Sequence, residues 1–371
     1  MIDLSWTELS VGLALFFNAS YARYILSYYR RYSTRFLCNK SSLNKSLVFF
    51  SLLLIIFVSS GSNSDWYHYQ DMVWNYKFYD GAHNHGEPIY GYIIQFINKN
   101  YLLFRLIVWG GAFLIVIRTF KRFELNINTA IFFLIAVFLL KFNYARASLA
   151  MSCYFFALSF LIKPEKAGMI LNLVVAALFF WAAYEFHHSL LPVILLTSAV
   201  YIPLDKPIVA ISLIITIPSF ASYVFSHLNL LSNFVNEESI QKLGGYIQQE
   251  TEQANFFGQI RNVIQYGAFV LPLIIDILTV FKHKKVVEIS IQRLLRITIA
   301  ITLFAIMFLF MNIQSTVFTY RYLFMTFIPL TIISVHLFQS GIMKKRLFCL
   351  ILLWGIGSNV YELLYGLYTT L

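Results

Sequence analysis

Charged residues are scarce in this sequence. Only 12% of the 371 residues are Asp, Glu, Lys or Arg, whereas an ordinary soluble domain carries roughly 25%. Acidic residues are the scarcer kind, with 17 Asp and Glu against 28 Lys and Arg, which gives a formal net charge of +11. Hydrophobic residues make up 59% of the chain. This composition excludes a water-soluble enzyme, a nucleic-acid-binding domain and a disordered chain.

Cysteine and clustered metal ligands are also rare. The three cysteines, Cys38, Cys153 and Cys349, show no metal-ligand spacing, so neither a disulfide nor a zinc site is expected. His83 and His85 are two residues apart, but no third ligand lies near them in a helical frame. The N-terminus lacks the basic region of a cleaved signal peptide, so the first apolar stretch is expected to remain as a membrane anchor.

Long apolar segments are what the sequence has in abundance. An α-helix needs about 20 residues to cross roughly 30 Å of hydrocarbon. Apolar windows of about this length recur along the whole chain, at 9–29, 47–60, 101–117, 127–142, 147–162, 167–185, 189–203, 207–224, 262–281, 294–312, 322–340 and 347–366. The second, fifth and seventh are short, so a re-entrant segment or a merged pair is an alternative there. We therefore predict one all-α integral membrane domain over residues 1–371, with about 12 transmembrane helices.

The basic residues predict the orientation of these helices, because Lys and Arg are retained on the cytoplasmic side. With both termini outside, most of them fall in cytoplasmic loops. The outer loops then hold only Lys77, Lys99, Lys141, Arg146, Lys242, Arg261 and Arg321. This asymmetry accounts for the basic charge without any nucleic acid.

Two predicted outer loops, about 61–100 and 225–261, are longer than ordinary connections, and such loops are usually functional or disordered. The first is rich in Trp, Tyr and His, a composition suited to lipid headgroups or to stacking on sugar rings. The second is polar and is predicted to be partly helical.

Arginines at the outer membrane boundary are the first candidates for chemistry. Arg146 and Arg321 are predicted where the chain re-enters the membrane, and a guanidinium there suits bidentate capture of phosphate. The alternative is a side chain that extends to ordinary lipid headgroups. Arg261 ends the second long loop. Arg105 lies slightly inside a predicted helix, where it must face the bundle or extend to the interface.

Histidines and carboxylates are the candidate bases. His187 and His188 follow Phe186 at the outer end of the sixth window, where a neutral imidazole can accept a proton. Adjacent residues on a helix point about 100° apart, so only one of the two is expected to face a given cavity. Asp65 and Glu87 lie among aromatics in the first outer loop. The alternative for the histidine is a hydrogen bond to backbone, and for a loop carboxylate it is simple solvation.

One acid, Asp276, falls inside the ninth window. Such a group is a candidate proton relay, or it extends to the interface or pairs with a basic neighbour.

The outer residues, taken in order, resemble a known family. The chain has Gly61, Asp65, Tyr69, Glu87-Pro88-x-Tyr90, Arg146 with Ala150, Phe186-His187-x-Ser189 and Arg321-Tyr322. This series is similar to the EpsG-like group of Wzy-type polysaccharide polymerases over about residues 60–325. Members of that group often carry Gln where this chain has Ala147.

The resemblance implies a membrane glycosyltransferase that polymerises O-antigen or a related surface glycan at the outer face of the bacterial cytoplasmic membrane. The growing glycan would move from undecaprenyl pyrophosphate to the non-reducing end of a new lipid-linked repeat unit. A chain-length-determinant protein is a candidate partner, besides membrane lipid. Arginines supplying the positive charge would make a metal or other cofactor unnecessary.

The roles then follow residue by residue. Arg146, Arg321 and Arg261 are predicted to hold the pyrophosphate. His187, Asp65 or Glu87 is predicted to orient or deprotonate the acceptor hydroxyl. Tyr69, Tyr90 and Tyr322 are predicted to contact the glycan.

Other classes of membrane protein remain as alternatives. A secondary transporter would have ionisable residues near the bilayer midplane and related halves, whereas these groups gather at the outer surface and no repeat is evident. A flippase for lipid-linked oligosaccharides would share the substrate and the arginines. A glycosyltransferase that uses a polyprenyl-phosphate sugar would suit Asp65 and Asp71 in the first outer loop.

Overall fold

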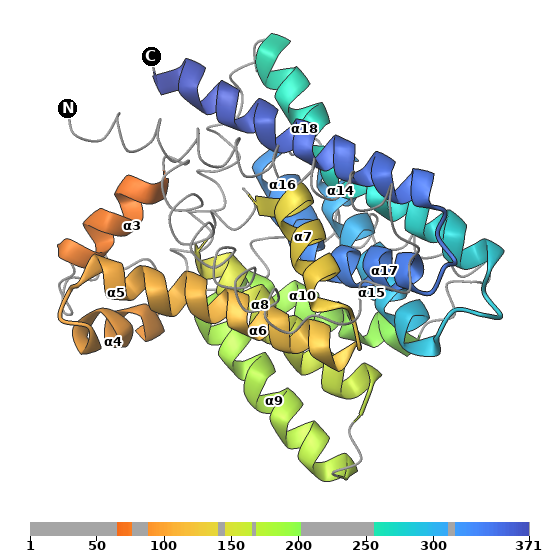
Figure 1. The fold of residues 1–371 in the computed structure, drawn as a ribbon. Coiled ribbons are helices and arrows are strands. Elements are labelled where there is room, and N and C mark those ends of the chain that lie inside the picture. The colour runs from red at the N-terminus through yellow and green to blue at the C-terminus, as the bar shows by residue number, and fades with distance from the viewer. Residues whose placement is uncertain are drawn as a thin grey trace.

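The computed structural model describes residues 65–75, 88–139, 145–164, 168–201, 256–310 and 316–370, and all regular structure within these ranges is helical (Figure 1). The N-terminal half contains α3 (Asp65–Trp74), α4 (Pro88–Phe96), α5 (Tyr101–Arg105), the π-helical turn η2 (Leu106–Gly110), α6 (Gly111–Arg122), α7 (Ile127–Phe138), α8 (Ala145–Ile162) and α9 (Met169–Phe186). The rest contains η4 (His188–Leu190), α10 (Leu191–Leu195), η5 (Leu196–Tyr201), α14 (Phe256–Lys282), α15 (Ile289–Phe310), α16 (Thr316–Phe324), α17 (Phe327–Gln339) and α18 (Lys345–Thr370).

Four helical segments in the described ranges are long and apolar enough to cross a membrane. They are Tyr101–Arg122, Met169–Phe186, Val263–Lys282 and Ile289–Ile306. Shorter apolar helices cover Ile127–Phe138, Arg146–Ile162, His188–Tyr201 and Phe327–Gln339. Each of these segments overlaps a window predicted from sequence, so the all-α fold is confirmed where the chain is described. The windows 9–29, 47–60 and 207–224 lie outside the described residues, and the total of about 12 helices stays a prediction.

Two predicted helices are interrupted in the structure. The described part of the window 189–203, which ends at Tyr201, consists of 3₁₀ turns around the five-residue helix α10. The window 322–340 is divided by a turn at Met325 and Thr326. There the Thr326 hydroxyl donates to the Leu323 carbonyl at 2.6 Å, a local bond that competes with the helical pattern. A hydropathy window detects an apolar segment but does not detect a turn within it.

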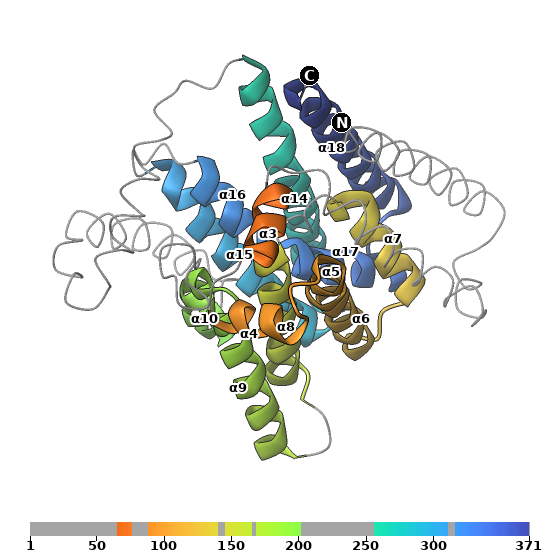
Figure 2. The same cartoon turned by 90° about the vertical axis from the view of Figure 1, so that its left-hand side faces the viewer.

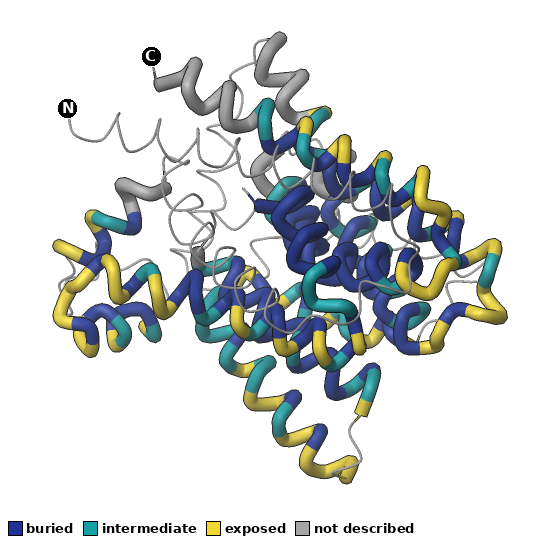
Figure 3. The backbone as a smooth tube through the Cα atoms, in the orientation of Figure 1, coloured by how far each residue is buried: buried dark blue, intermediate teal, exposed yellow. Residues whose placement is uncertain are grey.

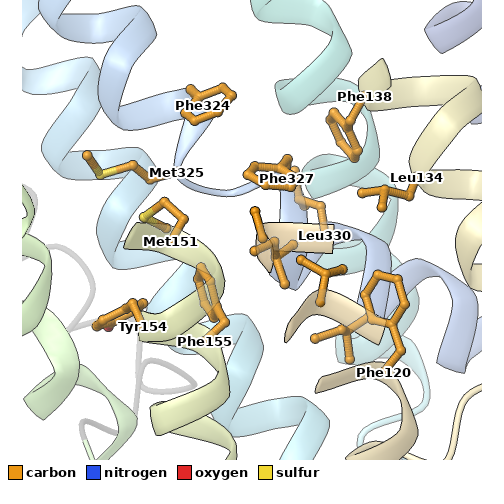
Figure 4. Close-up of a cluster of buried hydrophobic side chains, with 14 of the residues drawn as sticks. Phe120, Leu134, Phe138, Met151, Tyr154, Phe155, Phe324, Met325, Phe327 and Leu330 are labelled. Atoms are coloured by element: carbon orange, nitrogen blue, oxygen red, sulfur yellow. The ribbon is translucent and has the colours of Figure 1, made fainter. Parts of the chain in front are cut away.

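The centre of the bundle is formed by α7 and α17. Every residue from Thr129 to Phe138 is buried, and so is every residue from Phe327 to Val335. A helix that is apolar and buried on all sides lies in the interior of a bundle. Figure 4 shows Phe327 and Leu330 of α17 between Phe138 of α7 and the α8 side chains.

The last helix, α18, fits against α7 and α14 through small and polar residues. A Cβ added to Gly355 would lie 2.6 Å from the Val137 Cα, so only glycine allows this approach. One turn later the buried Asn359 amide donates to the Ala136 carbonyl at 2.9 Å. The Ser358 hydroxyl donates to the Ile264 carbonyl of α14 at 3.5 Å. These contacts fix α18 in the bundle without a charged pair.

The segment formed by α5, η2 and α6 runs parallel to α8. Gly111 lies against Leu149, since a Cβ there would be 3.9 Å from the Leu149 Cδ1. Farther along both helices, the Arg122 Nε donates to the Ser159 hydroxyl at 2.7 Å. Parallel neighbours require the connecting segment to travel back, which is the path of α7 (Figure 1). The alternation of directions predicted for these three segments therefore agrees with the structure.

Several connections predicted to be cytoplasmic meet at one end of the bundle. The Lys163 Nζ lies 2.8 Å from the Glu124 carboxylate and 3.8 Å from that of Glu288. Beside them the Asn126 backbone N–H donates to the Gln339 side chain at 3.2 Å. The turns that follow α6, α8, α14 and α17 thus share one end, and the assignment of this end to the cytoplasmic side stays a prediction.

One helix, α9, projects from the rest of the molecule (Figures 1 and 2). Its exposed side chains include Ile170, Val174, Leu178 and Trp181. The coloured backbone in Figure 3 shows the same contrast between α9 and the buried centre. A helix with this apolar exposed face is suited to contact with lipid.

Candidate functional site

The helices of the first outer loop gather at the end of the bundle opposite the loops that contain Glu124 and Lys163. Figure 1 shows α3, α4 and α5 together at this end, and Figure 2 looks directly at it. The chain turns from α4 into α5 at Asn98 and Lys99, both with positive φ, and the Asn100 side chain caps α5 by accepting from the Leu103 N–H at 3.2 Å. This local capping directs Tyr101–Arg122 back into the bundle. We call this end the outer end, following the sequence prediction.

Tyr90 joins two of the sequence motifs at the outer end. Its ring lies 5.9 Å from the ring of Phe186, at the end of α9, and 6.2 Å from that of Phe104. Tyr90 is 3% exposed, so its ring is covered by these neighbours. Tyr90 of one motif and Phe186 of another are therefore adjacent in space, although they lie 96 residues apart in the sequence.

His187 lies at a break in the chain. Helix α9 ends at Phe186, and His187 is extended, with φ −162° and ψ 100°. Its backbone N–H donates to the Ala183 and Tyr184 carbonyls, both at 3.1 Å, and its own carbonyl accepts from the Leu190 N–H at 2.9 Å. The neighbouring His188 ring stacks on Tyr184 with a centroid distance of 4.7 Å. The expectation that the two histidines diverge by a helical step is wrong, because neither belongs to α9.

Tyr322 brings a third motif to the same place. Its hydroxyl donates to the Ser189 carbonyl at 3.4 Å, and its ring lies edge-on to Phe304 at 4.8 Å. Tyr322 is 8% exposed. The Arg321-Tyr322 pair of α16 is thereby tied to the turn that follows His187, so motifs from three distant parts of the chain converge.

Tyr69 anchors α3 to the bundle. Its ring meets Trp109 of η2 edge-on at 5.9 Å, and only 5% of the residue is exposed. Two other aromatics of the same outer segment are open, with Trp74 55% exposed and Tyr92 62% exposed. The sequence predicted Tyr69, Tyr90 and Tyr322 as glycan contacts, and that role stays a prediction; Trp74 and Tyr92 are two further aromatic residues of this segment that are exposed.

Two of the three arginines predicted to hold the pyrophosphate, Arg146 and Arg321, are half-buried. Arg146 lies in the first turn of α8, which packs on η2. Arg321 lies in the last turn of α16, where a cation also interacts favourably with the helix dipole. Arg321 was expected in a loop but is helical. Half-burial suits a side chain that binds an anion while its stem is packed.

Arg105 is the residue whose position the structure clarifies most. It precedes the π-helical turn η2, and such turns are frequent at functional sites. Its neighbours on the same helix face, Tyr101, Val108 and Trp109, are all buried, so Arg105 faces the bundle rather than lipid. Its guanidinium carbon lies 5.7 Å from the centre of the Tyr101 ring. The sequence indicated this orientation of Arg105, because a charged side chain that faces lipid is costly.

Arg105 and Arg146 lie on adjacent parallel helices. Gly111 and Leu149 are side by side, so Arg146, three residues before Leu149, is level with Val108. Arg105 is three residues farther toward the outer end, roughly 4.5 Å at the helical rise of about 1.5 Å per residue. The two cations thus occupy neighbouring levels in the outer half of the bundle.

The remaining predicted residues lie at or beyond the limits of the described chain. Asp65 begins α3 and Arg261 lies in the first turns of α14, and for both only the backbone is described. Glu87 lies outside the described residues. Their roles stay predictions. Over the part of the chain that is described, no cluster of three or more His, Cys, Asp and Glu side chains is present.

Comparison with known proteins places the chain in a family. No curated protein and no solved structure matches the chain. The sequence profile of the EpsG family matches residues 42–361, which includes every motif that converges at the outer end. The chain therefore belongs to the EpsG family.

Proposed function

We propose that the protein is a surface-polysaccharide polymerase that extends a glycan carried on undecaprenyl pyrophosphate. The observation that carries the proposal is the convergence at the outer end, where Tyr90 contacts Phe186 and Tyr322 bonds to Ser189. Membership of the EpsG family and the apolar helical bundle support it. The outer face of the bacterial cytoplasmic membrane is the location that this function requires.

The proposed reaction is a displacement at the anomeric carbon of the growing glycan. A hydroxyl at the non-reducing end of the incoming repeat unit attacks, a new glycosidic bond forms, and the bond to the pyrophosphate oxygen breaks. The hydroxyl proton passes to a base, for which His187, Asp65 and Glu87 are the candidates. Undecaprenyl pyrophosphate leaves with the electron pair of the broken bond.

Arginines are the groups suited to stabilise this leaving group. Negative charge develops on the pyrophosphate as the bond breaks, and preorganised cations at that position lower the barrier. Arg146 and Arg321 are proposed for this role, with Arg261 and the bundle-facing Arg105 as further cations. The exposed rings of Trp74 and Tyr92 are proposed to stack on sugars of the glycan.

The test is the size distribution of surface polysaccharide in cells that lack the protein. Complementation with wild type should restore a ladder of polymer lengths, whereas Arg146→Ala and Arg321→Ala should yield single-repeat products at normal expression. Arg118→Ala is the matched control, because Arg118 is an exposed arginine on α6 toward the other end of the bundle. It should leave the ladder intact.

Two outcomes would count against the polymerase. Failure of single-repeat glycan to reach the surface would favour a flippase. An unchanged ladder in the cells lacking the protein would exclude both functions for this glycan.

A further inference from the structure

Asp276 is an acid enclosed within the membrane-spanning part of the bundle. It lies in the span Val263–Lys282 of α14 and is 0% exposed. Its carboxyl group contacts α17 through the buried Ser334, whose Oγ lies 2.9 Å from Oδ2 and 3.1 Å from Oδ1. A charge in such a position is costly, and an intramembrane acid calls for an explanation.

The other hydroxyls near this contact are already engaged with backbone. Thr279, one turn after Asp276, donates to the Ile275 carbonyl at 2.7 Å. Thr331, one turn before Ser334, donates to the Phe327 carbonyl at 2.8 Å. Within the described residues, Ser334 is therefore the residue whose hydroxyl forms the hydrogen bond with Asp276.

No cation lies against the Asp276 carboxyl group in the described part of the chain. Helix α14 packs on α15, α16, α17 and α18. Their basic groups and that of α14 itself include Lys282, Arg293, Arg296, Arg321, His336 and Lys345. None of these side chains forms an ion pair with Asp276. The pairing with a basic neighbour that the sequence allowed does not occur there.

The hydrogen bonds with Ser334 indicate the protonation state of the Asp276 carboxyl group. A serine hydroxyl has one hydrogen and can donate it to one carboxyl oxygen, whereas both oxygens lie within bonding distance of Oγ. If the acid carries a proton, it can donate to a lone pair of the Ser334 Oγ while the Ser334 hydroxyl donates to the other oxygen. Two hydrogen bonds then close a ring and no charge is buried.

We propose that Asp276 is a protonated, neutral carboxylic acid that forms this double hydrogen bond with Ser334 and fastens α14 to α17. The contact joins the helix that carries Arg261 to the one that follows Arg321 across a short turn. Asp276 is thus a contact between two helices within the membrane-spanning part of the bundle, not a relay that exchanges protons with solvent. The proposal stands independently of the reaction that the protein catalyses.

Infrared spectroscopy of the full-length protein in lipid vesicles tests the proposal. A protonated carboxyl group has a C=O stretching band well separated from that of a carboxylate, and it shifts in heavy water. We expect this band at neutral pH in the wild type, its loss in Asp276→Asn and its retention in Asp71→Asn, which changes an exposed acid of α3. Asp276→Asn should unfold near the wild-type temperature, since an amide can replace both hydrogen bonds, while Asp276→Ala should unfold lower.

A second variant keeps the test decisive if Asp276→Asn does not fold. Ser334→Ala removes one partner of the acid, so the C=O band should move to a different frequency. Absence of the band in the wild type, or a band that Ser334→Ala leaves unmoved, would overturn the proposal. So would equal destabilisation by Asp276→Asn and Asp276→Ala, because an ionised side chain would then be required.

Discussion

Three tyrosines at the outer end are buried against other aromatic side chains. Tyr69, Tyr90 and Tyr322 are each less than 10% exposed, and their rings rest on Trp109, Phe186 and Phe304. Sequence composition predicted that tyrosines of this region matter, but it could not distinguish a ring that shapes the site from one that borders solvent. Contact of these three tyrosines with the glycan stays a prediction.

The Tyr322 hydroxyl offers a test of the contact between α16 and the turn after His187. Tyr322→Phe removes the bond to the Ser189 carbonyl but retains the ring on Phe304. A bond of 3.4 Å is long, so we expect a loss of stability of about 0.5–1 kcal/mol, together with shorter polymer. Thermal unfolding and polymer length measure these effects. Tyr201→Phe alters an exposed tyrosine and should change neither.

Glu124 provides a pH-dependent contribution at the other end of the bundle. The hydrogen bond and charge of Lys163 lower the pKa of Glu124 below its ordinary value of 4.5. A depressed pKa in the folded state stabilises the protein above the unfolded-state pKa, and this gain is lost as the pH falls through the folded-state pKa.

Glu124→Gln should therefore lower the unfolding temperature slightly at neutral pH, and the difference should disappear once the pH is below the folded-state pKa of Glu124. Because Glu124 is largely exposed, we expect only a few tenths of a kcal/mol, about the size measured for surface pairs. Unfolding temperatures of wild type and variant, measured across pH 3 to 8, check this. Equal curves for the two proteins would mean that the Lys163 contact contributes nothing.

At the scale of helices, hydropathy predicted where apolar segments lie, because the length and composition of a span are local properties of the sequence. It did not predict the turn at Met325 and Thr326 or the π-helical turn η2. Both depend on single hydrogen bonds or on one extra residue in a turn. A hydropathy window averages over about 20 residues and does not detect such turns. These turns nevertheless affect the orientation of the neighbouring Arg321 and Arg105.

The close approach of α18 to α7 gives the clearest prediction at this scale. Gly355→Ala would place a Cβ 2.6 Å from the Val137 Cα, so the two helices must separate. We expect a destabilisation of about 1–3 kcal/mol, the usual range for overpacking. Gly357→Ala is the matched control, since its Cβ would meet nothing within 4 Å. Alanine has the higher helix propensity at both positions, so a thermal unfolding midpoint for Gly355→Ala as high as that for Gly357→Ala would contradict the close approach.

For the whole molecule, the order of short motifs along the chain carried more information than any one motif. The sequence predicted that these motifs lie on the same side of the membrane, but not that they contact one another. The contacts of Tyr90 with Phe186 and of Tyr322 with Ser189 depend on how the bundle packs, which periodicity does not encode. The base among His187, Asp65 and Glu87 is likewise not distinguished by residue type.

The central claim is tested most directly with the purified protein in lipid vesicles and a repeat unit on undecaprenyl pyrophosphate as the sole substrate. Products are separated by size, and released undecaprenyl pyrophosphate is measured. The proposed function predicts glycans of two or more repeat units, with one undecaprenyl pyrophosphate released for each new bond, and neither product with Arg146→Ala. Folded wild-type protein that moves the intact substrate across the bilayer without extending it would contradict the proposal.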